Sequence, residues 1–188
     1  MLKLDNVGFY YGDREVLKNF SLTVGDGECV SLQGSSGCGK TTVIKLLAGL
    51  CKPQSGEVFA PEKVSVVFQE DRLVPMLSVK RNILLPLKGD EKIKAIGLLK
   101  EIGLESEIDT EVRKLSGGMR RRVAIVRALA FSGDALLLDE PFNGLDGENK
   151  RIAADMILNE AESRNIPILL STHIGEDAEL LNSRVYKF

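Results

Sequence analysis

The sequence lacks tryptophan altogether, has a single histidine, His173, and contains only three cysteines in 188 residues. An odd number of cysteines without metal-ligand spacing excludes a disulfide framework and argues against a zinc site, so we expect reduced thiols at Cys29, Cys38 and Cys51. No segment approaches the roughly 18 consecutive apolar residues of a membrane span. Met1–Asp5 does not open a secretory signal, because an acidic residue appears at once. These absences predict a cytosolic protein.

Neither sign of charge dominates, since the formal net charge is only −2. No nucleic-acid partner is therefore expected, because nonspecific attraction to nucleic acid requires an excess of lysine and arginine. Hydrophobic residues make up 44% of the chain and charged residues 28%, which argues against long disordered segments. The length suits one domain with a sizeable core.

The pattern of apolar residues predicts an α/β fold. Two alternating segments, 2–11 and 16–24, flank a turn at Gly12-Asp13 and predict an N-terminal antiparallel hairpin. Helical patterns separate the further short apolar runs, which predicts a mostly parallel sheet. These runs lie at residues 29–33, 64–68, 135–138 and 168–170. Motifs at the ends of their strands should share one edge of the sheet.

Residues 70–133 contain no comparable strand pattern. Helical spacing occurs instead at 83–87, 93–102 and 121–130. We expect a helical subdomain inserted at 70–133 into a nucleotide-binding α/β core formed by 1–69 and 134–188. The whole chain, 1–188, would then be a single domain.

A glycine-rich segment fits the phosphate-loop pattern GxxxxGK[ST] between a predicted strand and a helical pattern that runs to Leu50. Its glycines let backbone N–H groups turn inward, and the helix start adds partial positive charge. Lys40 can then reach the terminal phosphates of a nucleotide, and Thr41 offers a hydroxyl to Mg²⁺. A plain glycine turn before a helix would not require the Lys-Thr pair. The expected nucleotide-binding residues are Gly34, Ser35, Ser36, Gly37, Cys38, Gly39, Lys40, Thr41 and Thr42.

Two carboxylates, Asp139 and Glu140, follow the apolar run 135–138. An Asp-Glu pair alone is more often a solvated helix start, but its position after a phosphate loop favours Mg²⁺ chemistry. Asp139 can hold the metal through its water shell, while Glu140 faces the position of an attacking water.

The segment Leu115–Met119 leads into a helical pattern, and its Ser116, Gly117 and Gly118 predict a second phosphate-binding helix start. Three arginines, Arg120 to Arg122, crowd the same end, where positive charge opposes the helix dipole. Either a nearby anion offsets that cost, or the arginines form a solvent-facing basic turn.

In their order and spacing, these motifs resemble the nucleotide-binding cassettes of the ABC ATPase family over nearly the whole chain. The resemblance implies a P-loop NTPase core, with ATP and Mg²⁺ as cofactors. The sequence lacks the Asn-Lys-x-Asp motif that reads guanine, which argues against a GTPase. The matching motifs are the phosphate loop, Gln69, Leu115–Met119, Asp139-Glu140, Asn143-Gly144-Leu145-Asp146 and Ser171-Thr172-His173.

The resemblance also implies roles for single residues around one bound ATP. Tyr11 would stack on adenine, although Tyr10 is a rival in the next register. Gln69 would contact Mg²⁺ and the lytic water, and His173 would contact the γ-phosphate. Together with Glu140, the general base, Gln69 and His173 would form the catalytic set, while Thr41, Gln69 and Asp139 would hold the metal.

A second cassette would complete the site, according to the resemblance. Ser116 and Gly118 would bind the γ-phosphate that the other subunit holds, and Asp146 would lie at the dimer seam. The cysteine in the phosphate loop, Cys38, lies beside Lys40, and we consider either a reactive thiol or a plain loop residue.

The resemblance implies the ATPase subunit of an ABC transporter, peripheral on the inner face of the cell membrane. A transmembrane permease subunit would dock near Gln69 to Leu77, a segment similar to that of nitrate, sulfonate and taurine-type importers. One alternative is a soluble ABC ATPase that acts on a protein complex, as in iron–sulfur assembly. Another, a nucleotide-binding regulator without hydrolysis, is disfavoured by the presence of Glu140 and His173.

The sequence departs from the family pattern at a few positions. Met119 stands in place of the usual glutamine, Ile174 in place of an acidic residue, and Ser183 in place of an aspartate. We expect the last residue, Phe188, to lie within a late core strand. None of these departures removes a side chain that the resemblance makes catalytic.

Overall fold

The computed structural model describes residues 1–188, and its larger sheet is parallel throughout, with the strand order β5-β6-β7-β3-β8. The strands are β3 (Cys29–Gln33), β5 (Ser65–Val67), β6 (Leu136–Asp139), β7 (Ile168–Thr172) and β8 (Arg184–Lys187). Strands β3, β5, β6 and β7 are short, apolar and mostly buried, as is typical of a parallel sheet covered on both faces. The predicted parallel core is confirmed. The expectation that Phe188 lies within a core strand is wrong, because β8 is a mostly exposed edge strand that ends at Lys187.

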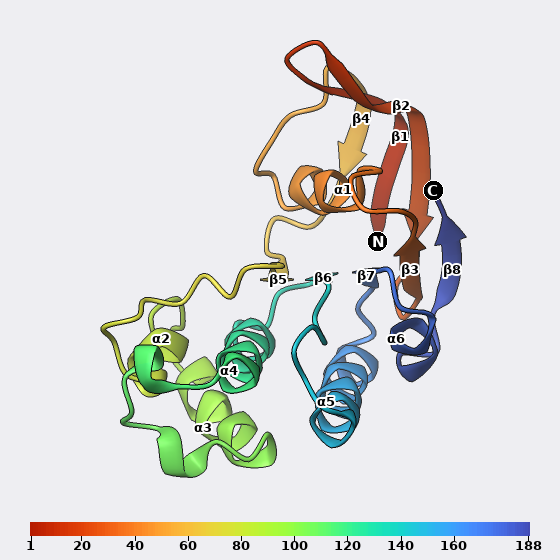
Figure 1. Cartoon of the computed structure of the whole chain (residues 1–188). Coiled ribbons are helices and arrows are strands. Elements are labelled where there is room, and N and C mark those ends of the chain that lie inside the picture. The colour runs from red at the N-terminus through yellow and green to blue at the C-terminus, as the bar shows by residue number, and fades with distance from the viewer.

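The smaller sheet is antiparallel, with the order β2-β1-β4, and lies with helix α1 on one side of the parallel sheet (Figure 1). Its elements are β1 (Leu2–Tyr11), β2 (Arg14–Val24) and β4 (Ser55–Phe59), and α1 covers Lys40–Leu47. The predicted hairpin is confirmed. Strand β4 was not predicted, because its five residues are mostly exposed and carry no alternating apolar pattern.

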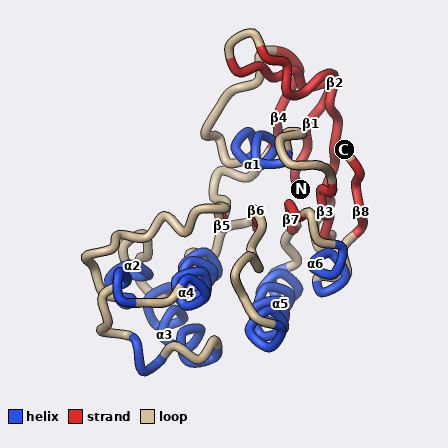
Figure 2. The backbone as a smooth tube through the Cα atoms, viewed as in Figure 1, coloured by secondary structure: helices blue, strands red, loops and turns tan.

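The other helices lie on the opposite side, with α2, α3 and α4 gathered beyond β5 (Figure 2). They are α2 (Val79–Leu84), α3 (Glu91–Glu101), α4 (Gly117–Ala130), α5 (Gly147–Arg164) and α6 (Gly175–Leu180), with 3₁₀ turns at Glu105–Glu107 and Val112–Lys114. No helix combines the length and the apolar character that a membrane crossing requires.

Two apolar clusters occupy the two faces of the parallel sheet. Successive residues of β6 point to opposite faces, so Leu137 joins the cluster under the antiparallel sheet, while Leu136 and Leu138 join the cluster formed with α2 to α5. The second cluster runs without a break from the helices of 70–133 to α5. The division into a core and a helical subdomain therefore stays a proposal.

Three predicted helix boundaries were wrong. The helix expected at 121–130 is α4, which begins at Gly117 because Ser116 caps it. The helix expected at 83–87 is α2, which starts earlier because the Ser78 hydroxyl accepts a hydrogen bond from the Arg81 amide at 3.3 Å, and ends before Pro86, which has no N–H. Helix α1 stops at Leu47 rather than Leu50, which is 55% exposed.

Two glycines with positive φ offer a test of how tightly β4 is held against β1. A Cβ on Gly56 (φ 78°) would lie 2.4 Å from the carbonyl oxygens of Asp5 and Asn6, whereas a Cβ on Gly49 (φ 68°) would meet nothing within 4 Å. We expect Gly49→Ala to lower the free energy of unfolding by about 1 kcal/mol, from the backbone conformation alone. Gly56→Ala should lower it by about 3 kcal/mol, because overlap with β1 adds to that strain. Urea unfolding measures both, and equal losses would contradict the close strand approach.

Candidate functional site

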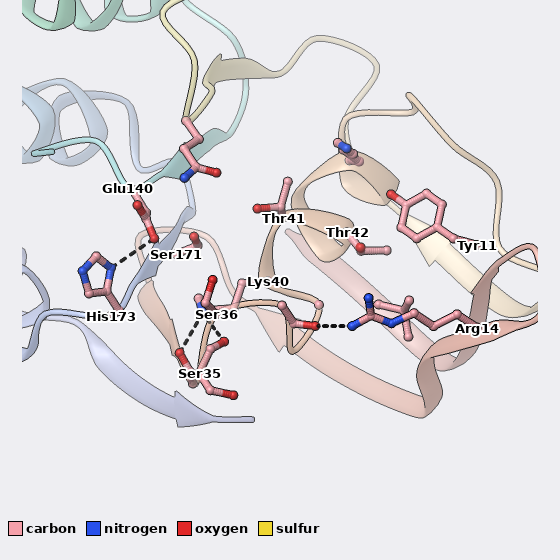
Figure 3. A pocket seen from close by; sticks show the side chains of 16 residues that line it. Tyr11, Arg14, Ser35, Ser36, Lys40, Thr41, Thr42, Glu140, Ser171 and His173 are labelled. Carbon is pink, nitrogen blue, oxygen red and sulfur yellow. Dashed lines mark hydrogen bonds and ion pairs between the residues drawn. The ribbon is translucent and has the colours of Figure 1, made fainter. Parts of the chain in front are cut away.

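A cavity of about 600 Å³ lies at the carboxyl edge of the parallel sheet, where β3, β6 and β7 end (Figure 3). The hairpin of β1 and β2 closes it on one side. Its lining combines the phosphate loop with groups from the ends of the strands: Tyr11, Arg14, Val16, Gly34, Ser35, Ser36, Gly37, Gly39, Lys40, Thr41, Thr42, Lys45, Gln69, Glu140, Ser171 and His173. Most of the predicted nucleotide residues therefore share one cavity.

The phosphate loop, residues 34–42, is shaped to receive an anion. Gly39 has φ 117°, which other residues rarely adopt, and it leads directly into α1, whose first N–H groups have no side-chain cap. The ammonium of Lys40 spans the loop and donates to the carbonyls of Gly34 at 2.7 Å and Ser35 at 3.0 Å. Uncapped amides at a helix start and a fixed cation make this a phosphate cradle.

The thiols differ in environment. Burial raises the pKa of the Cys29 thiol to about 12 and also raises the pKa of Cys51, so neither is a thiolate near neutral pH. Cys38 is not among the residues that line the cavity, although its Sγ lies 3.8 Å from Lys40 Nζ. The reactivity of Cys38 stays a prediction.

The hairpin presents Tyr11, not Tyr10, to the cavity. Tyr10 points elsewhere: its hydroxyl donates to Glu15 at 2.6 Å, and this bond raises the pKa of Tyr10. The sequence interpretation missed Arg14, whose guanidinium donates to the Gly37 carbonyl at 3.4 Å across the cavity mouth. Figure 3 shows Tyr11 and Arg14 on one side of the phosphate loop, opposite Glu140 and His173.

Lys45 was also missed, although its spacing gave a signal. It lies four residues after Thr41, and therefore on the same face of α1, where its Nζ is 6.0 Å from the centre of the Tyr11 ring. The cavity mouth thus carries an aromatic ring and two cations, Arg14 and Lys45, beside the phosphate cradle.

Asp139 is the last residue of β6, and only one of its two carboxylate oxygens is hydrogen-bonded. Its side chain is buried; Oδ1 accepts a hydrogen bond from the Ser171 hydroxyl at 2.5 Å, while Oδ2 has no partner. A buried carboxylate oxygen without a partner is costly unless a ligand or water satisfies it. The protein offers no cluster of three or more His, Cys, Asp or Glu residues for a metal. This donor set fits Mg²⁺, which commonly takes few carboxylates, together with water and phosphate oxygens.

Glu140 has a strained backbone and faces the cavity. Its φ is 48°, which is unusual for a residue with a side chain, and its amide donates to the Ser171 carbonyl at 2.9 Å. Its Oε1 lies 3.1 Å from Nδ1 of His173, which comes from the end of β7. The sheet therefore holds the carboxylate and the imidazole together on the side opposite Tyr11.

Arg121 is a buried group whose place in the site was not predicted. The expectation of a solvent-facing basic turn is wrong for it, since it is only 3% exposed and donates to backbone carbonyls at the end of β6 and after β5. Burial lowers the pKa of its guanidinium, and Asp71 opposes that shift. The signal was its place one turn before Ile125, on the apolar face of α4.

Arg121 also has an anion beside it, the Asp71 carboxylate at 3.3 Å, whereas the neighbouring arginines are held by backbone carbonyls. Arg120 donates to the Leu115 carbonyl at 2.9 Å and Arg122 to the Ile102 carbonyl at 2.8 Å. Each of the three arginines is thus bound to backbone oxygens of the same chain.

The residues Ser116, Gly117 and Gly118 do not line the cavity of their own chain. Ser116 is exposed and caps α4, accepting from the Met119 amide at 3.2 Å, while Met119 packs against the apolar cluster. A Cβ on Gly118 would lie 3.0 Å from the Gly144 carbonyl, so this turn packs on the loop after β6.

Asp146 caps α5 beside that turn. It is exposed, and its carboxylate accepts hydrogen bonds from the Asn149 amide at 2.9 Å and the Asn149 side chain at 2.7 Å. The bond from the Asn149 backbone lowers the pKa of Asp146. Asp146 also lies outside the cavity lining.

Comparison with known proteins gives close matches over the whole length. A family model described as ABC transporter matches residues 17–143. The aliphatic sulfonates import ATP-binding protein SsuB 1 of Shouchella clausii is 41% identical over 187 residues, 98% of this chain and 76% of the relative. An SsuB protein of Paraburkholderia xenovorans is 43% identical over 180 residues, 93% of this chain and 71% of the relative.

Solved structures agree. A dimeric bacterial ABC transporter cassette superposes with a TM-score of 0.87 at 30% identity, covering 100% of this chain and 94% of that one. A dimeric post-hydrolysis cassette bound to ADP and Pi gives a TM-score of 0.89 at the same identity and coverage. The chain therefore belongs to the ABC transporter family, as an ATP-hydrolysing cassette that uses Mg²⁺.

Proposed function

We propose that this cassette works in a dimer to drive an importer of aliphatic sulfonates or chemically similar small anions, through a separate membrane subunit. The observation that carries the proposal is the joining of a phosphate cradle and a Glu–His pair in one cavity, with the buried Asp139 carboxylate and its free oxygen directly before Glu140 in the chain. The substrate class rests on the printed function of the SsuB relatives. No observation favours the soluble alternative.

The nucleotide would lie along the cavity from the hairpin to the strand ends. Tyr11 offers an exposed ring face for adenine, with Arg14 and Lys45 beside the ribose and inner phosphates. Lys40 would exchange its two loop carbonyls for the β- and γ-phosphates, while the uncapped amides of α1 bind the same oxygens.

For hydrolysis, the strand ends would supply the reacting side chains. Glu140 would accept the proton of the attacking water, which the Gln69 amide orients, and His173 would donate to the γ-phosphate. Mg²⁺, bound through Thr41, Gln69 and Asp139, would neutralise charge on the β- and γ-phosphates. The Glu140–His173 contact at 3.1 Å keeps base and donor on one side of the phosphate.

A second cassette would complete the site, because Ser116, Gly117 and Gly118, which we call the signature residues, lie outside the cavity of their own chain. Ser116 and Gly118 of each chain would bind the γ-phosphate held by the other, and Asp146 would lie at the seam. Both Ser116 and Asp146 are exposed.

The membrane subunit would dock on residues 69–77, which we call the docking segment. Its Val74 and Met76 are 42% and 63% exposed, and Leu85 next to it is 70% exposed. A hollow of about 500 Å³ lies along α2 and reaches Leu77 at the end of the docking segment; it is lined by Leu77, Ser78, Lys80, Arg81, Leu84, Leu85 and Asp109. Exposed apolar side chains around a hollow suit a helix of a membrane protein. The cassette would thereby be held at the inner face of the membrane.

Replacing the proposed base tests the catalytic half of this proposal. Glu140→Gln keeps the shape of the side chain but cannot accept the proton, so ATP hydrolysis should fall by about 10² to 10⁴ while ATP still binds. The unhydrolysed ATP should hold two chains together, as a dimer in size-exclusion chromatography with ATP and a monomer without it.

Glu101→Gln, an exposed change on α3, is the matched control and should behave as wild type. Wild-type hydrolysis by Glu140→Gln would refute the assignment of the base. A Glu140→Gln protein that stays monomeric at saturating ATP would refute the composite site.

Growth of a deletion strain tests the transport part of the proposed function. Deleting the gene should prevent growth of the source organism on an aliphatic sulfonate as sole sulfur source, but not on sulfate. Wild type and Leu50→Glu should restore growth, whereas Met76→Glu should not, because a charge is placed in the apolar docking surface. Leu50 is a matched control, since it is 55% exposed and lies just beyond the C-terminal end of α1, outside the docking segment. Normal growth of the deletion strain on the sulfonate would reject that substrate class, and restoration by Met76→Glu would reject the docking surface.

A further inference from the structure

One side chain joins the docking segment to the end of β6. Arg121 donates to the carbonyls of Phe68 at 2.5 Å and Gln69 at 3.4 Å, and to the Asp71 carboxylate at 3.3 Å. The same guanidinium donates to three carbonyls on the other side, those of Asp139 at 2.8 Å, Glu140 at 2.6 Å and Pro141 at 2.8 Å. No other side chain in the structure makes hydrogen bonds both to residues 68–77 and to residues 139–141.

Because Arg121 is buried, its hydrogen bonds to both segments must be kept. Its side chain is 3% exposed, and a buried charge is tolerated only while its hydrogen bonds are made. Five of the six acceptors are backbone oxygens, so the bonds fix the path of the main chain on both sides. If either segment shifted alone, N–H groups of the guanidinium would lose their acceptors on that side. The charge would stay buried without those hydrogen bonds, which is unfavourable. The two segments should therefore move together.

A second arginine of α4 reaches only one of the two segments. Arg127 donates to the carbonyls of Asp71 and Arg72, each at 2.8 Å, and makes no bond to residues 139–141. Arg72 itself has φ 48° and places its guanidinium 3.5 Å from the centre of the Phe68 ring. Residues 68–72, which include this strained position, are thus held to α4 by two arginines, of which only Arg121 also contacts Glu140.

We propose that Arg121 is a positioning residue that couples the docking segment to the backbone of Glu140, so that each senses the position of the other. The proposal rests on the functions proposed above for Glu140 and for residues 69–77. Coupling runs in both directions, because a change in one equilibrium that alters the other must be reciprocal. Occupation of the nucleotide cavity should then stabilise residues 70–72 of the docking segment, which, unlike Gln69, do not line that cavity.

Hydrogen–deuterium exchange of the full chain, with and without MgAMP-PNP, tests the coupling. In wild type, the analogue should slow amide exchange in residues 70–72 by on the order of tenfold, the effect of stabilising one charge-assisted hydrogen bond. In Arg121→Gln the ratio of the exchange rates without and with the analogue should fall to about one, while the affinity for AMP-PNP changes little. The kcat of ATP hydrolysis should fall and its KM should stay nearly unchanged. Arg121→Lys keeps the charge but reaches fewer carbonyls, so it should restore part of the ratio; if the glutamine variant does not fold, the reduced ratio in the lysine variant carries the test.

Two neighbouring variants separate coupling from general loosening of α4. Arg122→Gln removes a bond to Ile102, away from both segments, and should keep the wild-type ratio. Arg127→Gln should speed exchange in residues 70–72 but still show slowing by the analogue. A wild-type ratio in Arg121→Gln, or an equal loss in Arg122→Gln, would overturn the coupling while leaving the proposed function intact. Failure of wild type to bind AMP-PNP would instead overturn the proposed function, and this inference with it.

Discussion

The carboxyl edge of the five-stranded parallel sheet is the constraint on which the rest of the structure depends. Parallel strands all end at one edge, so β3, β6 and β7 deliver the phosphate loop, Glu140, Ser171 and His173 to a single cavity, with Asp139 buried directly before Glu140. Hydrogen bonds between neighbouring strand ends then set the spacing: Ser171 binds both the Asp139 carboxylate and the Glu140 amide. The apolar clusters on the two faces hold this edge in place, one beneath the antiparallel sheet and one against α2 to α5.

The same arrangement leaves the site open on one side. The start of α4, with its signature residues, lies outside the cavity, while its Arg121 reaches the backbone of the strand ends from within. In the proposed dimer, helix α4 would present its exposed N-terminus to the second cassette, while its buried face contacts the backbone of Glu140 through Arg121. The solved relatives are dimeric cassettes, which agrees with that proposal.

Much of the fold and of the site could be predicted from the sequence, because phosphate loops and strand-end carboxylates occur at fixed spacings in contiguous motifs. Helix ends were less predictable: Ser78 and Pro86 determine α2 more strongly than the apolar spacing that suggested 83–87. The partners of Arg14 and Arg121 could not be assigned, because they are mainly backbone carbonyls distant in sequence, which no local pattern records. Strand β4 forms through pairing with β1 and not through a pattern of its own.

The central claim is that each chain holds half of two shared ATP sites, and complementation tests it most directly. Lys40→Ala should disable the phosphate cradle, and Ser116→Arg the signature turn, so each variant alone should form only defective sites. In an equimolar mixture, about half of the dimers should be mixed, each with one intact site, and ATP hydrolysis should recover to about a quarter of the wild-type rate. A mixture as inactive as its two components would contradict the shared site, as would full activity of Ser116→Arg on its own.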